Sequence, residues 1–285
     1  MSKWRPSFLN CIYVIPDIRG SLDLLKNICA RILPLRKSDG GNDTLVFLGN
    51  YTGKTEQSAY VFDYLIDIKE KFGDRVVFLR GATEACILRK LGVIDKPFSF
   101  ECSEDAISVW LRSGGYETIS GYLKRFNVSD VNPHCLTTDR ILNLIPEVHV
   151  NFLINHTINY YHLEDYIFVH AGLDLDKDLE GSSFQSLFFD RKLCTSVIRS
   201  IGMGEKVSAL SGKTIVAGAN YKELVKLGSS SYKPLIREEF MMLDCGSPSR
   251  LLVVELRSMD AFLAKKRKKR LIRQTLHESS FKFKN

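Results

Sequence analysis

The chain has 285 residues, of which 45% are hydrophobic and 26% charged, a composition typical of a folded globular protein with a buried core. Seven scattered cysteines form no Cys-x-x-Cys pair, which argues against a disulfide framework or a zinc knuckle and indicates a reducing compartment. No apolar run approaches the roughly 20 residues that span a bilayer. The early run 8–15 leads into Pro16-Asp17 rather than into a signal-peptide cleavage site, so we expect a cytoplasmic protein.

The net charge of +7 is concentrated at one end of the chain. Residues 261–285 carry nine Lys or Arg and one acid, Glu278, for a local charge of +8, and the other 260 residues sum to −1. The body is therefore nearly neutral, and the composition as a whole excludes neither an enzyme nor a binding protein.

The first ninety residues predict a β-α-β-α-β unit. Strands are expected at 11–15, 44–48 and 75–79, because each is a short aliphatic or β-branched run followed by a polar loop. Apolar residues at helical spacing predict one helix that starts after Ser21 and ends at Pro34, and a second at 57–72.

The remainder predicts a helical insertion and a second group of strands. Residues 84–155 are predominantly helical in pattern, with two short helices broken at Gly114-Gly115. Further strands are expected at 158–161, 166–169, 214–216, 240–243 and 251–256. We therefore predict one domain at 1–260, with its insertion at about 84–155, and a basic tail at 261–285.

Five of the expected strands lead into glycine-rich or polar segments. These are Pro16-Asp17-Ile18-Arg19-Gly20, Gly49-Asn50-Tyr51-Thr52-Gly53-Lys54-Thr55, Gly81-Ala82-Thr83-Glu84, Phe168-Val169-His170-Ala171-Gly172-Leu173 and Val216-Ala217-Gly218-Ala219-Asn220. The carboxyl ends of buried parallel strands are where chemistry is usually placed, so these segments mark the candidate site.

This ordered series resembles the calcineurin-like metallophosphoesterases, the family of the phosphoprotein (serine/threonine) phosphatases. The family's blocks are Gly-Asp-x-His-Gly, Gly-Asp-x-x-Asp-Arg-Gly, Gly-Asn-His-Glu, His-Ala-Gly and Gly-His-Thr. Trp110-Leu-Arg-Ser-Gly-Gly115 and Leu179-Glu180 resemble segments of its short bacterial branch, which includes protein phosphatases and dinucleoside-polyphosphate hydrolases. The resemblance covers about residues 10–257 and implies an α/β metallophosphoesterase sandwich, with two central sheets flanked by helices.

Members of this family hold two divalent cations about 3.5–4 Å apart. At an effective dielectric constant of about 20 such ions repel each other by roughly 17 kcal/mol, so anionic ligands are essential. Of the six ligand positions the resemblance implies, this chain retains Asp17 and His170. The other four are occupied by Arg19 for a histidine, Asn50 for the bridging aspartate, Ala82 for an asparagine and Ala219 for the late histidine.

The positions that the resemblance implies for catalysis have changed as well. Thr83 stands in place of the proton-donating histidine, and Gly53 in place of the aspartate that pairs with it. The phosphate-gripping arginine is Lys54, a cation without the bidentate guanidinium fork. Arg112 is a second candidate for phosphate contact, with a solvated helix charge as the equal alternative.

Structural explanations exist for several of these residues. The Arg19 guanidinium is expected to pair with Asp17, so that a buried carboxylate is not left alone. His170 is either a relic ligand or a core histidine hydrogen-bonded at the end of a strand, and Glu84 is expected to serve as a first-turn helix acid. The other histidines, His149 among them, sit in no motif and are expected to be satisfied or exposed.

The leading prediction is a pseudophosphatase, a phosphatase-fold protein with a binding or regulatory role toward a phosphoprotein or another protein partner. No cofactor is expected. The alternative is an active hydrolase with a reduced site, a single divalent metal (Mn, Ni, Zn or Fe) on Asp17 and His170 with Asn50 as a further ligand, acting on phosphoprotein or nucleotide phosphoesters.

The basic tail adds an alternative from another class. The run Lys265-Lys-Arg-Lys-Lys-Arg270 is expected to be a solvated charge run, with contact to an anionic membrane or to RNA as the other options. The apolar residues that flank this run are compatible with a short amphipathic helix. The sequence indicates no oligomeric state.

Overall fold

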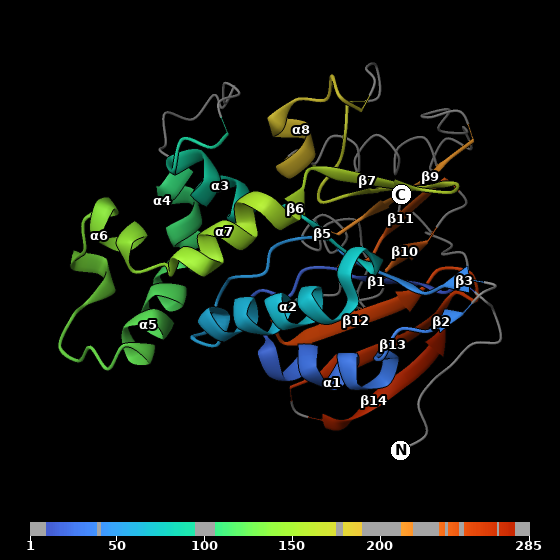
Figure 1. The fold of residues 1–285 in the computed structure, drawn as a ribbon, viewed down its shortest axis with the longest axis horizontal. Helices are drawn as coiled ribbons and strands as arrows, with labels where there is room; N and C mark the ends of the chain where they lie inside the picture. The colour runs from blue at the N-terminus through green and yellow to red at the C-terminus, as the bar shows by residue number, and fades with distance from the viewer. Residues whose placement is uncertain are drawn as a thin grey trace, which may run out of the picture.

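The strands of the protein form two stacked sheets, and helices cover the outer face of the larger one (Figure 1). This computed structural model describes residues 10–38, 41–94, 106–174, 179–189, 212–218, 234–236, 239–244, 248–266 and 268–276. A separate short hairpin is formed by β2 (Lys37–Ser38) and β3 (Gly41–Asn42).

The larger sheet has seven strands in the order β14-β13-β12-β1-β4-β5-β6. Its parallel half consists of β1 (Ile12–Ile15), β4 (Thr44–Phe47), β5 (Val76–Leu79) and β6 (Thr157–Ile158). Its antiparallel half consists of β12 (Arg250–Glu255), β13 (Asp260–Lys265) and β14 (Lys268–Thr275). The three strands predicted in the first ninety residues are therefore confirmed, and they lie side by side.

The smaller sheet has five strands in the order β10-β11-β9-β8-β7. The strands are β7 (Tyr160–Leu163), β8 (Tyr166–Val169), β9 (Thr214–Ala217), β10 (Leu235–Ile236) and β11 (Phe240–Met242). Because β8, β9 and β11 are parallel, their carboxyl ends lie at one edge of the sheet.

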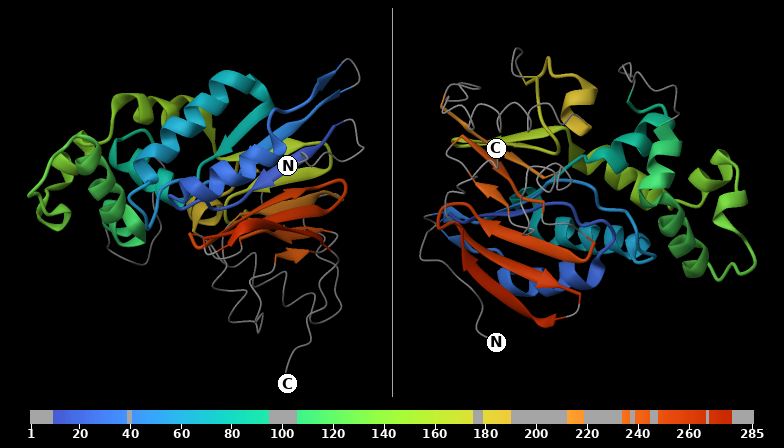
Figure 2. Two further views of the ribbon diagram at one scale, coloured as in Figure 1. Left: turned by 90° about the horizontal axis from the view of Figure 1, so that it is seen from below. Right: turned by 180° about the vertical axis from the view of Figure 1, so that it is seen from behind.

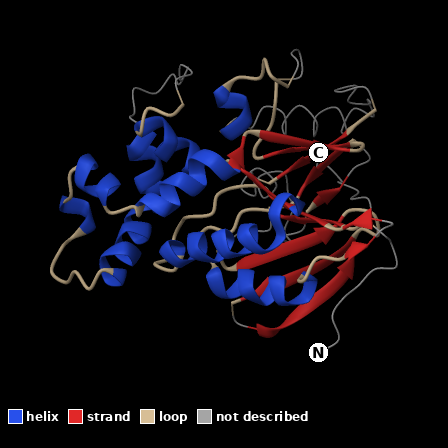
Figure 3. Ribbon diagram, in the orientation of Figure 1, coloured by secondary structure: helices blue, strands red, loops and turns tan. Residues whose placement is uncertain are grey.

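Two long helices, α1 (Leu22–Ile32) and α2 (Ser58–Phe72), lie against the outer face of the larger sheet. The predicted helical insertion extends to one side of both sheets (Figures 2 and 3). It contains α3 (Ala82–Lys90), α4 (Ala106–Trp110), α5 (Tyr116–Arg125), α6 (Thr138–Asn143) and α7 (Glu147–His156). A short α8 (Phe184–Phe188) follows β8.

The predicted break in the insertion lies in a π-helical turn, Leu111–Gly115, between α4 and α5. Gly114 adopts a φ of 119° there, a conformation that a residue with a Cβ avoids. No helix in the described ranges is long and apolar enough to cross a membrane.

Both faces of the larger sheet are buried, which explains why its central strands read as continuous apolar runs. Tyr13 and Ile15 point toward the helices, whereas Ile12 and Val14 point toward the smaller sheet. The second core layer includes Phe168 from the facing sheet. The packing of this sandwich positions the carboxyl ends of β1, β4, β5 and β8 near one another.

The basic segment differs from its prediction. Residues 261–265 and 268–275 belong to β13 and β14, so the predicted tail begins inside the larger sheet, and no helix forms there. β14 is the edge strand, and its sequence begins Lys-Lys-Arg. Contact of the basic segment with lipid or RNA stays a prediction.

His149 links three helices through a buried chain of hydrogen bonds. Its Nδ1 lies 2.8 Å from the Tyr122 hydroxyl on α5, and its Nε2 lies 2.9 Å from Asp63 Oδ1 on α2. Asp63 Oδ2 in turn pairs with Arg125. A neutral ring that donates Nε2–H to the carboxylate and accepts the phenolic proton satisfies every contact. The expected role of a satisfied core histidine is thus confirmed.

We predict that acid weakens the fold through this histidine. Burial lowers the pKa of His149 against the pull of Asp63, so the folded protein holds it neutral below the ordinary value of about 6.5. Unfolding then takes up a proton, and the unfolding free energy falls as the pH drops below about 6.5, by up to about 1.4 kcal/mol per pH unit. Urea unfolding between pH 7.5 and 5 measures this fall. The fall of the unfolding free energy with pH should be shallower in His149→Gln. Equal slopes in the wild-type and variant proteins would contradict the assignment of this fall to His149.

Candidate functional site

The loops after β1 and β4 are tied together by their backbones. The amides of Ile18 and Arg19 both donate to the Asn50 carbonyl, at 3.2 and 2.8 Å, and the Gly20 amide donates to the Tyr51 carbonyl at 2.8 Å. The neighbouring parallel strands β1 and β4 bring these loops to the same edge of the sheet. Asp17 and Asn50 consequently lie at one place, although 33 residues separate them.

The buried Glu84 carboxylate anchors the loop after β5 to the loop after β4. Its Oε2 accepts from the amides of Asn50 and Gly81 at 2.8 and 2.9 Å, and its Oε1 accepts from the Tyr51 amide at 2.9 Å. The Thr83 hydroxyl donates to the same Oε1 at 2.7 Å. Since Gly81 precedes α3, Glu84 serves as the first-turn acid the sequence predicts, and it also fixes the neighbouring loop.

Two non-glycine residues adopt left-handed backbone conformations at the strand ends. Arg19 has a φ of 48° and Asn50 a φ of 54°. Asparagine tolerates this region better than most residues, whereas arginine has no special tolerance of it. Strained positions of this kind are typical of functional sites, where surrounding contacts must hold them in place.

Asp17 lies at the centre of the site, fully buried, and three donors converge on its Oδ2. The Arg19 Nη2 and Nε lie 2.7 and 2.9 Å from it, and the Asn50 Nδ2 lies 2.9 Å from it. Three donors on one oxygen fit the carboxylate form. The pairing of Arg19 with Asp17 predicted from the sequence is confirmed.

Asn50 turns its amide nitrogen toward Asp17 and its oxygen away. That oxygen, Oδ1, accepts from the Thr83 amide at 3.0 Å, and the Thr83 hydroxyl lies 3.2 Å away. A hydrogen-bond chain therefore runs from Arg19 through Asp17, Asn50 and Thr83 to Glu84. Four of its five members, all but Glu84, occupy positions at which the resemblance predicts a metal ligand or the proton donor.

His170 is buried beside Asp17 with one ring nitrogen unpaired. Its Nδ1 lies 2.7 Å from the Leu48 carbonyl and 3.8 Å from Asp17 Oδ1. A carbonyl only accepts, so Nδ1 carries the proton and Nε2 keeps a lone pair. Within the described part of the chain, the buried atoms His170 Nε2 and Asp17 Oδ1 have no hydrogen-bond partner. They are acceptor atoms, which suit a water molecule or a cation.

The electrostatic field of the site favours a cation at Arg19 and a neutral His170. Burial opposes the charge of Arg19, but Asp17, Asp244 and Glu84 outweigh it and raise the pKa of Arg19. Burial lowers the pKa of His170 to about 4. Burial also raises the pKa of Asp17, a shift that the Arg19 guanidinium and the Asn50 amide oppose.

Asp244 is a further residue of the site, and none of the five segments predicts it. This buried residue follows β11 and acts electrostatically on both Arg19 and His170. Its position directly after the predicted strand 240–243 is the same signal that marked the other strand-end residues.

The two predicted phosphate-binding residues lie on segments that touch. A Cβ added to Gly114 would lie 2.4 Å from the Gly53 carbonyl carbon and 2.6 Å from the Lys54 amide, so the π-helical turn packs directly on this loop. The turn also carries Arg112, and both cationic side chains are exposed. Ala82 begins α3 without a donor atom, and Ala219 lies outside the described residues.

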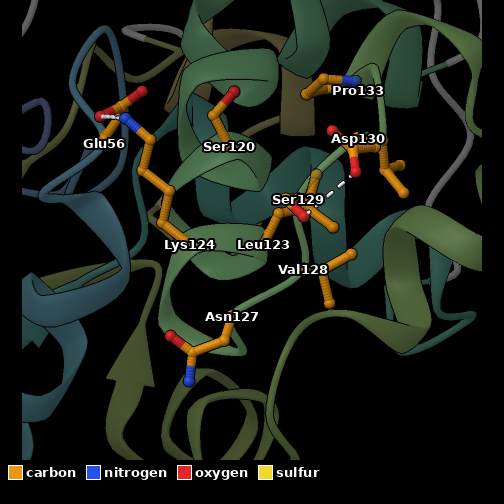
Figure 4. Close-up of a pocket in the computed structure, with 10 residues that line it drawn as sticks. Glu56, Ser120, Leu123, Lys124, Asn127, Val128, Ser129, Asp130 and Pro133 are labelled. Carbon is orange, nitrogen blue, oxygen red and sulfur yellow. Dashed lines mark hydrogen bonds and ion pairs between the residues drawn. The ribbon is translucent and has the colours of Figure 1, made fainter.

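A cleft of about 530 Å³ lies elsewhere, along α5 and the chain that follows it (Figure 4). Its lining includes Leu123, Val128 and Pro133, together with the ion-paired Lys124 and Glu56. None of the predicted site residues lines it. The chemistry of the strand-end loops therefore does not take place in this cleft.

Comparison with known proteins supports the fold. No known family model matches the sequence, and no curated protein matches it. A crystal structure described as "a putative diadenosine tetraphosphatase" superimposes with a TM-score of 0.50 at 13% identity, over 92% of this chain and 96% of that one.

Two further solved structures are similar to the chain at lower scores. A protein serine/threonine phosphatase from Saccharomyces cerevisiae superimposes with a TM-score of 0.47 at 11% identity, over 96% of this chain and 81% of that one. A metallophosphoesterase from Sphaerobacter thermophilus superimposes with a TM-score of 0.41 at 11% identity, over 94% of this chain and 89% of that one. The chain has the mixed α/β metallophosphoesterase fold, with two sheets and flanking helices.

The residues present do not fit the dinuclear metal centre that this fold commonly holds. Across the described residues, no group of three or more His, Cys, Asp or Glu side chains is arranged to hold a metal. Asn50 presents N–H groups to Asp17, and Arg19 presents a fixed positive charge. Asp17 Oδ1 and His170 Nε2 are two ligand atoms, fewer than the three or four protein ligands of typical zinc sites.

We predict that Glu84→Gln destabilises the protein by about 1–3 kcal/mol, because an amide N–H₂ would face backbone amides that now donate to a carboxylate. Urea unfolding measures the change. Glu56→Gln is the matched control, since the Glu56–Lys124 pair is exposed and its loss costs at most about 1 kcal/mol. Equal effects of the two substitutions would contradict the anchoring role of Glu84.

Proposed function

We propose that this protein is a pseudophosphatase, a metallophosphoesterase-fold protein that does not hydrolyse phosphoesters and acts by binding a phosphorylated ligand or protein partner. One observation carries the proposal. The carboxylate that a metal centre of this fold would use, Asp17, has one oxygen occupied by Arg19 and Asn50. A metal-activated water, the usual nucleophile of such enzymes, has no assembled ligand set among the residues that the structure describes.

The lack of a suitable general acid supports the same proposal. Thr83 occupies the position of the expected proton donor, and its hydroxyl donates to Glu84 at 2.7 Å. An aliphatic hydroxyl is a poor acid near neutral pH, where efficient catalysis needs a group that titrates near the working pH. His170 is the only histidine the retained motifs supply, and burial holds it neutral.

A second candidate function, hydrolysis with a single metal, is favoured by the two unpaired buried acceptors, Asp17 Oδ1 and His170 Nε2. In that hypothesis they would hold one divalent cation, which would polarise a phosphoryl oxygen or activate a water. Asn50 would have to release Thr83 to supply its oxygen as a third ligand. The pseudophosphatase proposal requires no such rearrangement, so we favour it.

We predict that the purified protein releases no phosphate from an aryl phosphate in Mn²⁺, Ni²⁺, Zn²⁺ or Fe²⁺. Metal analysis of the same protein should find less than one bound divalent ion per chain. Asp17→Ala is the control for contaminating activity. Two bound metals, or turnover that Asp17→Ala abolishes, would overturn the proposal.

We also predict that the protein binds a phosphorylated peptide more tightly than its unphosphorylated form, with Lys54 as one contact. Lys54 is exposed, and no hydrogen bond or ion pair of its side chain occurs within the described part of the chain. Lys54→Met should lower the affinity for the phosphopeptide about fivefold, which corresponds to the loss of roughly 1 kcal/mol from an exposed charge contact. Lys124→Met, on α5, is the matched control. Titration by fluorescence anisotropy measures the affinity of each variant for the peptide. Equal affinity of the wild-type protein for the phosphorylated and unphosphorylated peptides would contradict phosphate recognition.

A further inference from the structure

The site resolves, with its own side chains, a problem that any buried carboxylate poses. Asp17 is fully buried, and a buried charge is tolerated only when it is paired and hydrogen-bonded. The neighbouring acids Glu84 and Asp244, also buried, make the field more negative. A positive charge is therefore required at this place, and in a metallophosphoesterase fold metal ions commonly supply it.

We infer that Arg19 is the built-in cation of this site, that it takes the electrostatic place of a metal, and that it makes the stability of the site independent of divalent ions. The inference goes beyond the proposed function, because it concerns what holds the site together and not what binds there. The contacts of the guanidinium and the shape of its loop carry it.

The loop is shaped to deliver this guanidinium. Arg19 follows Asp17 by two residues, and the left-handed backbone at Arg19 allows its side chain to fold back onto Asp17 Oδ2 through both Nε and Nη2. A Cβ added to Gly53 would lie 2.8 Å from Arg19 Cβ and 2.9 Å from Arg19 Cα. Only a residue without a side chain permits this approach, so Gly53 and Arg19 are matched to each other.

The other substituted positions complete the arrangement. Asn50 adds an N–H donor to the same oxygen of Asp17, and Thr83 satisfies the far side of the Asn50 amide. A carboxylate at position 50 would instead face Asp17 Oδ2 across the 2.9 Å that Asn50 Nδ2 now spans. Two carboxylates at that distance cannot both stay ionised unless a cation lies between them, and otherwise one of them takes up a proton. Asn50 and Arg19 are thus the residue types that a metal-free site needs.

The experiment measures the thermal midpoint, Tm, of purified variants in EDTA and in excess Mn²⁺ or Zn²⁺ alone. The wild-type Tm should be the same in all three conditions. Arg19→His, which suits the left-handed backbone, should lower Tm in EDTA by about 10 °C, because it leaves a buried charge uncompensated. Added metal should restore part of that loss, since the new imidazole joins Asp17 Oδ1 and His170 Nε2 as a ligand.

A double variant and a control make the result decisive. Arg19→His/Asp17→Asn removes the buried charge, so its Tm in EDTA should exceed that of Arg19→His, and metal should no longer raise it. Lys124→Met, which breaks an exposed pair, should leave Tm unchanged. A wild-type Tm raised by metal, or an Arg19→His protein as stable as wild type in EDTA, would overturn the inference. Because the readout is Tm, a failure to bind the phosphopeptide, which would count against the proposed function, would leave this result standing.

Discussion

A fully buried carboxylate needs a positive partner, and the architecture of this site follows from that constraint at Asp17. The partner is Arg19, only two residues away in the same loop. Such a short separation obliges the backbone to turn back sharply, which accounts for the left-handed conformation at Arg19. The cost of that conformation is offset by the ion pair, by backbone bonds to Asn50, and by the space that Gly53 leaves open.

The same constraint extends across the sheet, because β1, β4 and β5 are adjacent and parallel. Their ends place Asp17, Asn50 and Thr83 in one hydrogen-bonded chain that finishes at the buried Glu84. Buried polar networks of this kind are favourable only when each member is satisfied. Among the described residues, this hydrogen-bond network and its neighbour His170 meet that requirement except at Asp17 Oδ1 and His170 Nε2, which are the atoms that a ligand would contact.

Local patterns in the sequence predicted the strands that position the site, the helices between them and the Arg19–Asp17 pair. Those predictions succeed because buried parallel strands, the residues that follow them and short-range charge pairs are all readable within a few residues. The pairing of β14 with β13 could not be read in this way. A run of cations resembles a solvated tail, and only the partner strand, which itself pairs with the distant β12, gives the segment its conformation. The effect of Asp244 on Arg19 could not be predicted for a related reason, since the two residues come close only once the fold brings the ends of β1 and β11 together.

The substituted residues depend on one another, and this decides how the site responds to change. An aspartate at position 50 would set two carboxylates against each other, although its oxygen could still accept from Thr83. Adding a side chain at Gly53 alone would collide with the backbone of Arg19. Substitutions within one hydrogen-bonded network are not additive, so we expect changes at these positions to be energetically coupled. Asp17, Arg19, Asn50 and Gly53 therefore form one interdependent unit, in which a change at a single member removes contacts that the others need.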